Sequence, residues 1–384
     1  MTITRDIPAL VENLISKLKR RQVIGSWSVS TETLLVLRQV ISVSKWNNVR
    51  ALLDDIAHIG HRLVTAQPQE LAVGNIVRRV LHMIREEYKV HLKELEEDKD
   101  GQNGTDSDPS TCDEASLRVG TTTSAPTVAS MFTLMGGIDF TEEAMDYSRS
   151  VYTFKPTVIQ EITEMIDELV NIYSNIAGHA LEQINSSEII MTSGKSRTVI
   201  EFLKAAARER QFQVIVVDSS SKKETLDLAK GLVAVGITTT IVPHAAIFAI
   251  MSKVNKVILG THAVMANGGL IAVSGTQSIA AAAHYHSTPV VVLTGLYKLS
   301  PLFPMDHELL NICVSPSTVT NYADGDIVEH VEVVAPYFDY VAPELVSLFI
   351  TNVGGHPPSY LYRLITENYD PIDSHLEHTP HPTL

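Results

Sequence analysis

Between residues 187 and 293 the chain alternates short β-branched runs with helical patterns. The runs predict strands over 187–192, 213–217, 237–242, 255–259 and 289–293, and the intervening patterns predict helices over 196–209, 222–235, 244–252 and 275–286. The runs are continuously apolar, which indicates strands buried on both faces, as in a parallel sheet covered by helices. The sequence therefore predicts an α/β domain with a parallel sheet.

The first 92 residues show helical periodicity. Over 8–20 the apolar residues fall on one face, and basic residues gather at the end, where the helix dipole favours them. Ser28 or Ser30 suits the N-cap of a second helix, and two further helical patterns cover 47–65 and 70–90. These patterns predict an N-terminal helical domain.

The last of these helices carries an unusual group of arginines. Arg78, Arg79 and Arg85 lie away from the apolar stripe formed by residues 73, 76, 77, 80, 81 and 84. Two interpretations remain open: a solvated face on a packed helix, or a surface that faces a partner.

Composition divides the rest of the chain. An acidic stretch that buries too little apolar surface to fold is followed by an amphipathic pattern over 156–184. The predicted segments are a disordered insertion over 93–127, a connector and long helix over 128–185, the α/β domain over 186–370 and a tail over 371–384.

The overall charge and the cysteine count narrow the function. The 384 residues have a formal net charge of -14, which argues against nucleic-acid binding through a broad basic surface. Two cysteines far apart give neither a disulfide framework nor a CxxC metal site. No apolar run has the length of a signal peptide or a membrane span, so we expect a soluble, cytosolic protein. We also expect neither a metal nor a cofactor.

The turn after the first predicted strand is a candidate anion site. It contains Ser193, Gly194, Lys195, Ser196 and Arg197 at the start of a helix, where unpaired backbone N–H groups attract anions. A nucleotide P-loop is excluded, because the GxxxxGKS pattern needs glycine at 189 and the chain has Ile189. An anion cradle for a phosphate or sugar phosphate and a plain helix cap both remain possible.

A second glycine-containing loop follows the strand predicted over 255–259. Within 260–269, Asn267, Gly268 and Gly269 permit close backbone approach, and the loop starts at the same sheet edge as the turn at 193. The two loops could enclose one cavity, or the second could be purely structural. No GxSxG, HExxH or GxGxxG motif is present, and His284 and His286 lack an evident third ligand for a metal.

Six segments resemble the regulatory subunits of eukaryotic translation initiation factor 2B. They are GNIVRRVL (74–81), IMTSGKSRTV (190–199), AAIFAIM (245–251), VNKVILGT (254–261), FDYVAPEL (338–345) and GGHPPSYLYRL (354–364). The resemblance spans nearly the whole chain apart from the acidic insertion and the last dozen residues. It implies a Rossmann-like C-terminal domain related to methylthioribose-1-phosphate and ribose-1,5-bisphosphate isomerases.

The resemblance also implies that isomerase chemistry is lost. The related enzymes use a cysteine and an aspartate, and the matching positions here are Ser193 and His262. A serine of ordinary pKa does not replace a thiolate, and His262 is not a carboxylate. We therefore expect no catalytic residue, although a sugar-phosphate isomerase and a metabolite-sensing paralogue remain the alternatives.

The partners follow from the same resemblance. It implies a decamer with alpha, gamma, delta and epsilon subunits that exchanges nucleotide on initiation factor 2 and senses phosphorylation of that factor's alpha subunit, with no direct contact to nucleic acid or membrane. Near the delta contact it places Ser187, Ile189, Gln213, Thr240 and Val242. Substitutions there are expected to disturb assembly more than folding.

Overall fold

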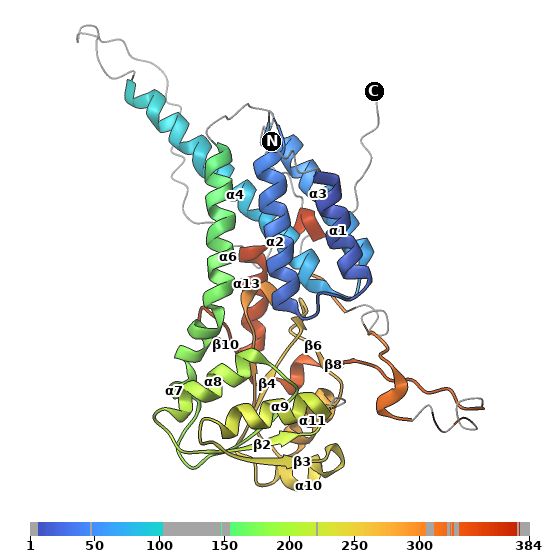
Figure 1. Cartoon of the computed structure of the whole chain (residues 1–384). Helices are drawn as coiled ribbons and strands as arrows, with labels where there is room; N and C mark the ends of the chain where they lie inside the picture. Colours follow the sequence, from blue (N-terminus) through green and yellow to red (C-terminus); the bar gives the residue numbers. More distant parts are fainter. Residues whose placement is uncertain are drawn as a thin grey trace, which may run out of the picture.

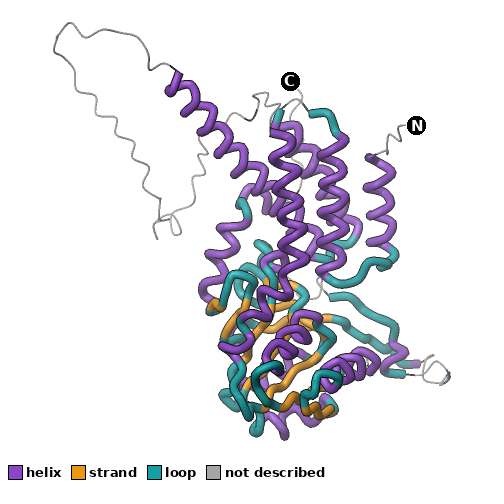
Figure 2. The backbone as a smooth tube through the Cα atoms, turned by 60° about the vertical axis from the view of Figure 1, so that its left-hand side comes forward, coloured by secondary structure: helices purple, strands orange, loops and turns teal. Residues whose placement is uncertain are grey.

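A computed structural model gives the fold of the chain and describes residues 7–46, 48–102, 147, 154–219, 222–304, 311–320, 323, 325, 330–374 and 376. A bundle of helices stands on a sheet-containing body; the long helix α6 runs down the bundle to that body, whereas α4 leads away from it and its last turns project beyond the bundle (Figure 1). Figure 2 shows the same division, with the strands gathered at one end.

The helical part follows the apolar periodicity of the sequence. Its elements are α1 (Ile7–Lys19), α2 (Ser26–Val43), α3 (Val49–Ala66), α4 (Leu71–Gln102), α6 (Phe154–Gly178) and the short α7 (Ala180–Gln183). Helix α3 is capped by Asn48, whose Oδ1 accepts a hydrogen bond from the Ala51 N–H at 3.0 Å. The predicted cap of α2 is wrong: α2 starts at Ser26 after Gly25, and Ser30 is buried inside the helix.

The predicted sheet is confirmed. Its strands are β1 (Ile189–Ser193), β2 (Gln213–Val217), β3 (Thr238–Val242), β4 (Lys256–Gly260), β7 (Val290–Leu293), β9 (Leu348–Ile350) and β10 (Gly355–His356), in the order β10-β9-β7-β4-β1-β2-β3. All neighbours pair in parallel except β10, which is antiparallel to β9. Because β4 and β2 flank β1, the carboxyl end of β1 lies at the centre of the sheet edge where ligands of such folds bind.

Helices cover both faces of this sheet and define two cores. Alternate residues of β1 separate them: Ile190 packs with α8 (Arg197–Ala207), α9 (Lys222–Val233) and the helical bundle, while Met191 packs with α10 (Ile247–Met251), α11 (Thr276–Tyr285) and α13 (Leu361–Asn368). One hydrophobic core thus runs from the bundle into the sheet, which fixes the two parts against each other.

A small antiparallel sheet was not predicted. It consists of β5 (Ala263–Val264), β6 (Leu270–Val273) and β8 (Phe338–Val341), and it occupies the region expected to be a glycine loop. Strand β8 pairs with β6 from far along the chain, with Val273 opposite Phe338. A two-residue strand and such a distant partner give no periodicity that a sequence pattern could reveal.

Two predicted segment boundaries need correction. Helix α4 continues to Gln102, so the insertion predicted from residue 93 starts inside a helix, and the rest of it lies outside the described residues. The predicted tail begins with a 3₁₀ turn at Pro371–Ser374 that packs on α4, with Asp373 buried. The chain after residue 370 is therefore part of the folded body at least to the buried Leu376.

The arginines of α4 do not form a solvated or partner-facing surface. Arg78 and Arg85 are only 5% and 9% exposed, because α4 turns them towards the C-terminal segment. The Arg78 Nε donates to the backbone oxygen of Asp373 at 2.9 Å, and Arg85 donates to both carboxylate oxygens of the same residue. The half-buried Arg79 pairs with Glu168 of α6 at 2.6 Å. The prediction of a partner-facing arginine surface is thus corrected, since these charges pair within the chain.

Candidate functional site

A cavity of about 620 Å³ lies where the helical bundle meets the carboxyl ends of β1 and β4. The bundle contributes the loop at 24–28 and Tyr173, and the sheet domain contributes the remaining walls. The sheet-domain residues are Ser193, Gly194, Lys195, Ser196, Arg197, Thr198, Ile200, Gly260, Thr261, His262, Val273, Thr276, Tyr297, Lys298, Tyr337 and Phe338. The turn at 193 and the first residues of the 260 loop line this one cavity, which favours the enclosure left open from the sequence over a purely structural loop.

The turn at 193 is shaped as a helix cap. Gly194 has a φ of 72°, which favours glycine, and Ser196 caps α8 by accepting from the Val199 N–H at 3.5 Å. Gly260 allows β4 to approach this cap, since a Cβ at residue 260 would lie 2.5 Å from the Ser196 Oγ. The absence of a side chain at 260 therefore lets the two loops share one cavity.

Both exposed cations of the turn, Lys195 and Arg197, contact other side chains of the chain. The Lys195 amine pairs with Asp227 of α9 at 3.2 Å, while the Arg197 guanidinium lies 4.5 Å from the ring centre of Tyr173 and 5.7 Å from that of Trp27. Arg197 thus stacks on two aromatic rings at the cavity wall. The N–H groups at the start of α8 remain the part of this turn best suited to an anion.

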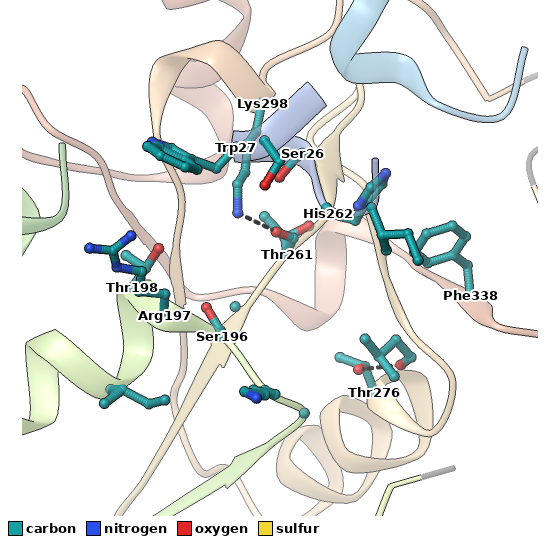
Figure 3. A pocket seen from close by; sticks show the side chains of 18 of the residues that line it. Ser26, Trp27, Ser196, Arg197, Thr198, Thr261, His262, Thr276, Lys298 and Phe338 are labelled. Atoms are coloured by element: carbon teal, nitrogen blue, oxygen red, sulfur yellow. Dashed lines mark hydrogen bonds between the residues drawn. The ribbon is translucent and has the colours of Figure 1, made fainter. Parts of the chain in front are cut away.

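Sequence reasoning missed a buried amine in the same cavity. Lys298, in the 3₁₀ turn Leu296–Lys298 after β7, is 7% exposed and donates from Nζ to the backbone oxygen of Thr261 at 2.7 Å (Figure 3). The sequence contains one signal of this site: Lys298 is a lone lysine in the apolar stretch 289–302. Lysine is almost never fully buried unless its charge is paired, so its place in this stretch indicates a special environment.

An acidic group from the bundle reaches the same region. Glu70, just before α4 and 7% exposed, places its Oε1 3.0 Å from the Nε2 of His262. The His262 ring also packs on Phe338, with ring centres 4.6 Å apart, and Figure 3 shows the two side chains together. Glu70, His262 and Lys298 thus join the bundle to the sheet domain through polar groups.

Burial shifts the pKa values of three side chains at this cavity, Lys298, Tyr297 and Tyr173. It lowers the pKa of Lys298 to about 8, against the attraction of the Glu70 carboxylate, which raises it. Burial also raises the pKa of Tyr297, with further increases from Tyr173 and Glu70 and an opposing hydrogen bond from Ser26. The pKa of Tyr173 rises to about 12 through burial, although the nearby Arg197 lowers it.

Asn267, Gly268 and Gly269 do not line this cavity. They form the turn between β5 and β6, where Gly268 has a φ of 82° and the Asn267 Nδ2 donates to the Tyr340 hydroxyl at 2.7 Å. The Asn267 Oδ1 accepts from the Gly269 N–H at 2.9 Å. The prediction that these three residues belong to the anion pocket is wrong, because the hairpin carries them away from the carboxyl end of β4.

The residues predicted near a subunit contact differ in exposure. Ser187, Gln213 and Thr240 are exposed, Ile189 is half-buried, and Val242 is buried at 6% exposure. Ile189 and Gln213 are paired across β1 and β2, and β3 with Thr240 forms the edge of the sheet. Val242 belongs to the second core, so a substitution there acts on the fold, which corrects its assignment to a contact surface.

An exposed aromatic cluster lies on α10 and α11. Phe248 and Tyr285 are 54% and 73% exposed, and their ring centres lie 5.0 Å apart. The His286 ring lies 4.9 Å from that of Phe248. The sequence favoured core or surface histidines over metal ligands at 284 and 286, but it did not reveal the aromatic rings beside His286.

Within the described part of the chain, two kinds of site are not seen. No group of three or more histidine, cysteine, aspartate or glutamate residues is arranged to hold a metal. No described helix combines the length and apolarity needed to cross a membrane.

Known proteins match this chain along most of its length. The model of the initiation factor 2 subunit family matches residues 22–358. Translation initiation factor eIF2B subunit beta of Schizosaccharomyces pombe is 43% identical over 381 residues, 95% of this chain and 96% of that protein.

Solved structures agree with the sequence matches. The crystal structure of eIF2B beta from Chaetomium thermophilum is 28% identical, with a TM-score of 0.68 over 97% of this chain and 94% of that chain. A chain of the tetrameric eIF2B-beta2-delta2 complex from C. thermophilum gives a TM-score of 0.67 at 28% identity, covering 95% of this chain and 96% of that chain. The fold and family predicted from the six sequence segments are thereby confirmed, and the chain belongs to the initiation factor 2 subunit family.

Proposed function

We propose that this chain is a non-catalytic, beta-type regulatory subunit of the complex that exchanges guanine nucleotide on translation initiation factor 2. The supporting observation is the likeness to beta subunits along nearly the whole chain, in both sequence and fold. Its partners are then the alpha, gamma, delta and epsilon subunits, and it helps bind initiation factor 2 and sense phosphorylation of that factor's alpha subunit in the cytosol.

Copurification tests this role. Tagged full-length chain, expressed in its own cells, is expected to bring down delta, gamma and epsilon chains, with mass measurement giving the stoichiometry. A matched tagged chain of the same size from another family controls for nonspecific capture. Recovery of a stable monomer without these subunits would contradict the proposal.

The absence of isomerase activity is part of the proposal. Ser193 and His262 both line the cavity, but a serine hydroxyl is a poor substitute for a thiolate. His262 faces Glu70 from the bundle, which favours a structural role for the pair. Purified chain is therefore expected not to turn over methylthioribose-1-phosphate or ribose-1,5-bisphosphate, and measurable turnover would establish the alternative.

Anion binding is a second candidate function. The start of α8, with Ser193, Gly194, Lys195, Ser196 and Arg197, faces a cavity that also contains a buried lysine. Calorimetry with inorganic phosphate and with ribose-1,5-bisphosphate is expected to detect binding that Arg197→Ala weakens severalfold, because the stacked guanidinium adds positive potential. Equal binding by Arg197→Ala and wild type would remove Arg197 from the site.

Exposed positions on β2 and on the edge strand β3 are expected to serve assembly. Gln213→Arg and Thr240→Arg place new charges on β2 and β3 without entering either core, so the free energy of unfolding should change by less than about 0.5 kcal/mol. The same variants should lose recovery of the delta subunit, as measured by sizing of the copurified complex.

A buried position on the same strand as Thr240 provides the control for an effect on the fold. Val242→Ala alters the second core and is expected to lower thermal stability, whereas Ser187→Ala lies at an exposed position before β1. Intact complexes with both arginine variants would show that this edge lies outside the subunit contact.

A further inference from the structure

Lys298 places a buried amine at the cavity, and the proposed regulatory role assigns no task to it. It lies in a cavity large enough for a small metabolite, and its one recorded hydrogen bond is to an uncharged acceptor, the backbone oxygen of Thr261. No ion pair within the described chain involves this amine. Lysines in such surroundings lose their proton readily and react with carbonyl groups.

The groups around Lys298 favour this reactivity. The Tyr297 ring centre lies 5.7 Å from Nζ, and burial keeps the Tyr297 hydroxyl protonated. Glu70 is the acidic group whose charge acts on the amine, and His262, which lies 3.0 Å from this carboxylate, lines the cavity. With a pKa of about 8, a much larger share of the Lys298 amine than of an ordinary lysine is neutral at about pH 7.5.

The opposite part of the cavity suits an anion. The first turn of α8 contributes backbone N–H groups at residues 197 and 198, both of which line the cavity. Figure 3 shows Lys298 and the start of α8 around one space, with the Lys298 amine hydrogen-bonded to Thr261. A ligand with an anionic group at one end and a carbonyl at the other matches this arrangement.

We propose that Lys298 is a carbonyl-reactive amine and that the cavity takes small aldehydes that carry a phosphate. The neutral Nζ adds its lone pair to the aldehyde carbon, and the carbonyl oxygen takes up a proton to give a carbinolamine. That hydroxyl then leaves as water while the nitrogen loses its remaining proton and the C=N bond forms. Imine formation changes no oxidation state, so it needs neither an oxidant nor a cofactor, and water reverses it. The imine is therefore present only while a ligand occupies the junction of bundle and sheet domain.

This reactivity goes beyond the proposed role in the exchange complex and does not depend on it. Full-length chain is treated with pyridoxal 5′-phosphate, reduced with borohydride to fix the imine, digested and mapped by mass spectrometry. The expected result is near-stoichiometric label at Lys298, at least tenfold less label with pyridoxal, which lacks the phosphate, and competition by inorganic phosphate.

Two lysine variants make the test specific. Lys298→Arg keeps a positive charge but cannot form an imine, and it should lose the label. Lys195→Arg, at the exposed lysine of the same cavity, should keep it. Label on Lys195, or spread over surface lysines, would overturn the proposal, and mapping of the wild-type chain decides this even if Lys298→Arg fails to fold.

The pH profile gives an independent readout. Labelling at Lys298 should rise from about pH 6.5, reach half of its maximum near pH 8 and level off at about pH 9, where the amine is mostly neutral. Glu70→Gln should move this profile to lower pH, since the carboxylate raises the pKa of Lys298. A labelling rate that still climbs steeply beyond pH 9 would show an ordinary solvated lysine and contradict the proposal.

Discussion

Replacing Arg85 by alanine is expected to destabilise the folded chain by about 3–5 kcal/mol, because it leaves a buried carboxylate without its partner. The Arg85 guanidinium holds Asp373 through two hydrogen bonds, one of 2.9 Å from Nη2 to Oδ1, and it lies 3.4 Å from Asp370. Burial lowers the pKa of Arg85, but the hydrogen bond and charge of Asp373 outweigh it and the net shift is upward. Arg85 therefore remains charged in the folded chain. Its removal deprives the Asp373 and Asp370 carboxylates of this charge, which destabilises the fold.

Urea unfolding of the purified chain measures this effect. Arg363→Ala is the matched control, since Arg363 pairs with Glu367 on the exposed face of α13 and its loss should leave the unfolding midpoint unchanged. Replacing both Arg85 and Asp373 by apolar residues should recover part of the stability, because no buried charge is then unpaired. If Arg85→Ala unfolds at the same urea concentration as Arg363→Ala, the buried pair contributes little.

This ion pair also has a consequence for domain coupling. Asp373 follows α13, whereas Arg85 belongs to the helical bundle, so the pair ties the end of the sheet domain to α4. Tyr369 adds a second tie within the sheet domain, since its hydroxyl donates to the Leu299 backbone oxygen at 2.6 Å. Hydrogen-bonded residues thus connect α4 to Asp373, and Tyr369 to Leu299, the neighbour of Lys298.

The arginines show why part of the structure could not be predicted from the sequence. A helix pattern tells which residues lie opposite the apolar stripe, and it placed Arg78 and Arg85 there. It does not tell what covers that face, and the covering segment lies 288 residues further along the chain in the case of Asp373. The parallel sheet was predictable, in contrast, because each buried strand shows its own continuous apolar run.

The candidate site could likewise be predicted only in part from the sequence. The turn at 193 was found because its small residues and helix start are contiguous. Glu70 and Lys298 come from different parts of the chain and meet at Thr261 and His262 only after the bundle packs on the sheet domain. Asn267 to Gly269 were misplaced because a two-residue strand, β5, lies between them and β4 and redirects the chain.

Gly260→Ala is expected to destabilise the fold by about 1–3 kcal/mol, because the added methyl group overpacks the contact between β4 and the start of α8. Its Cβ would lie 2.5 Å from the Ser196 Oγ and 2.6 Å from the Ser196 Cβ. Ser196 must then move, although its hydroxyl caps α8. Thermal unfolding measures the loss, and calorimetry with inorganic phosphate should show weaker binding, because the N–H groups of residues 197 and 198 move with the cap.

A second substitution tests whether the contact with Ser196, rather than any change in β4, causes the loss of stability. Ser196→Gly removes the two atoms that lie closer than 3 Å to the new methyl group and leaves the Val199 Cγ2, at 3.4 Å, as the next contact, and glycine is an acceptable N-cap. The pair Gly260→Ala and Ser196→Gly should therefore recover most of the stability lost by Gly260→Ala alone. Gly231→Ala in α9 is the matched control, since a Cβ there meets nothing within 4 Å and alanine favours the helix. A double variant as unstable as Gly260→Ala would mean that the close approach of Ser196 is not the reason for glycine at 260.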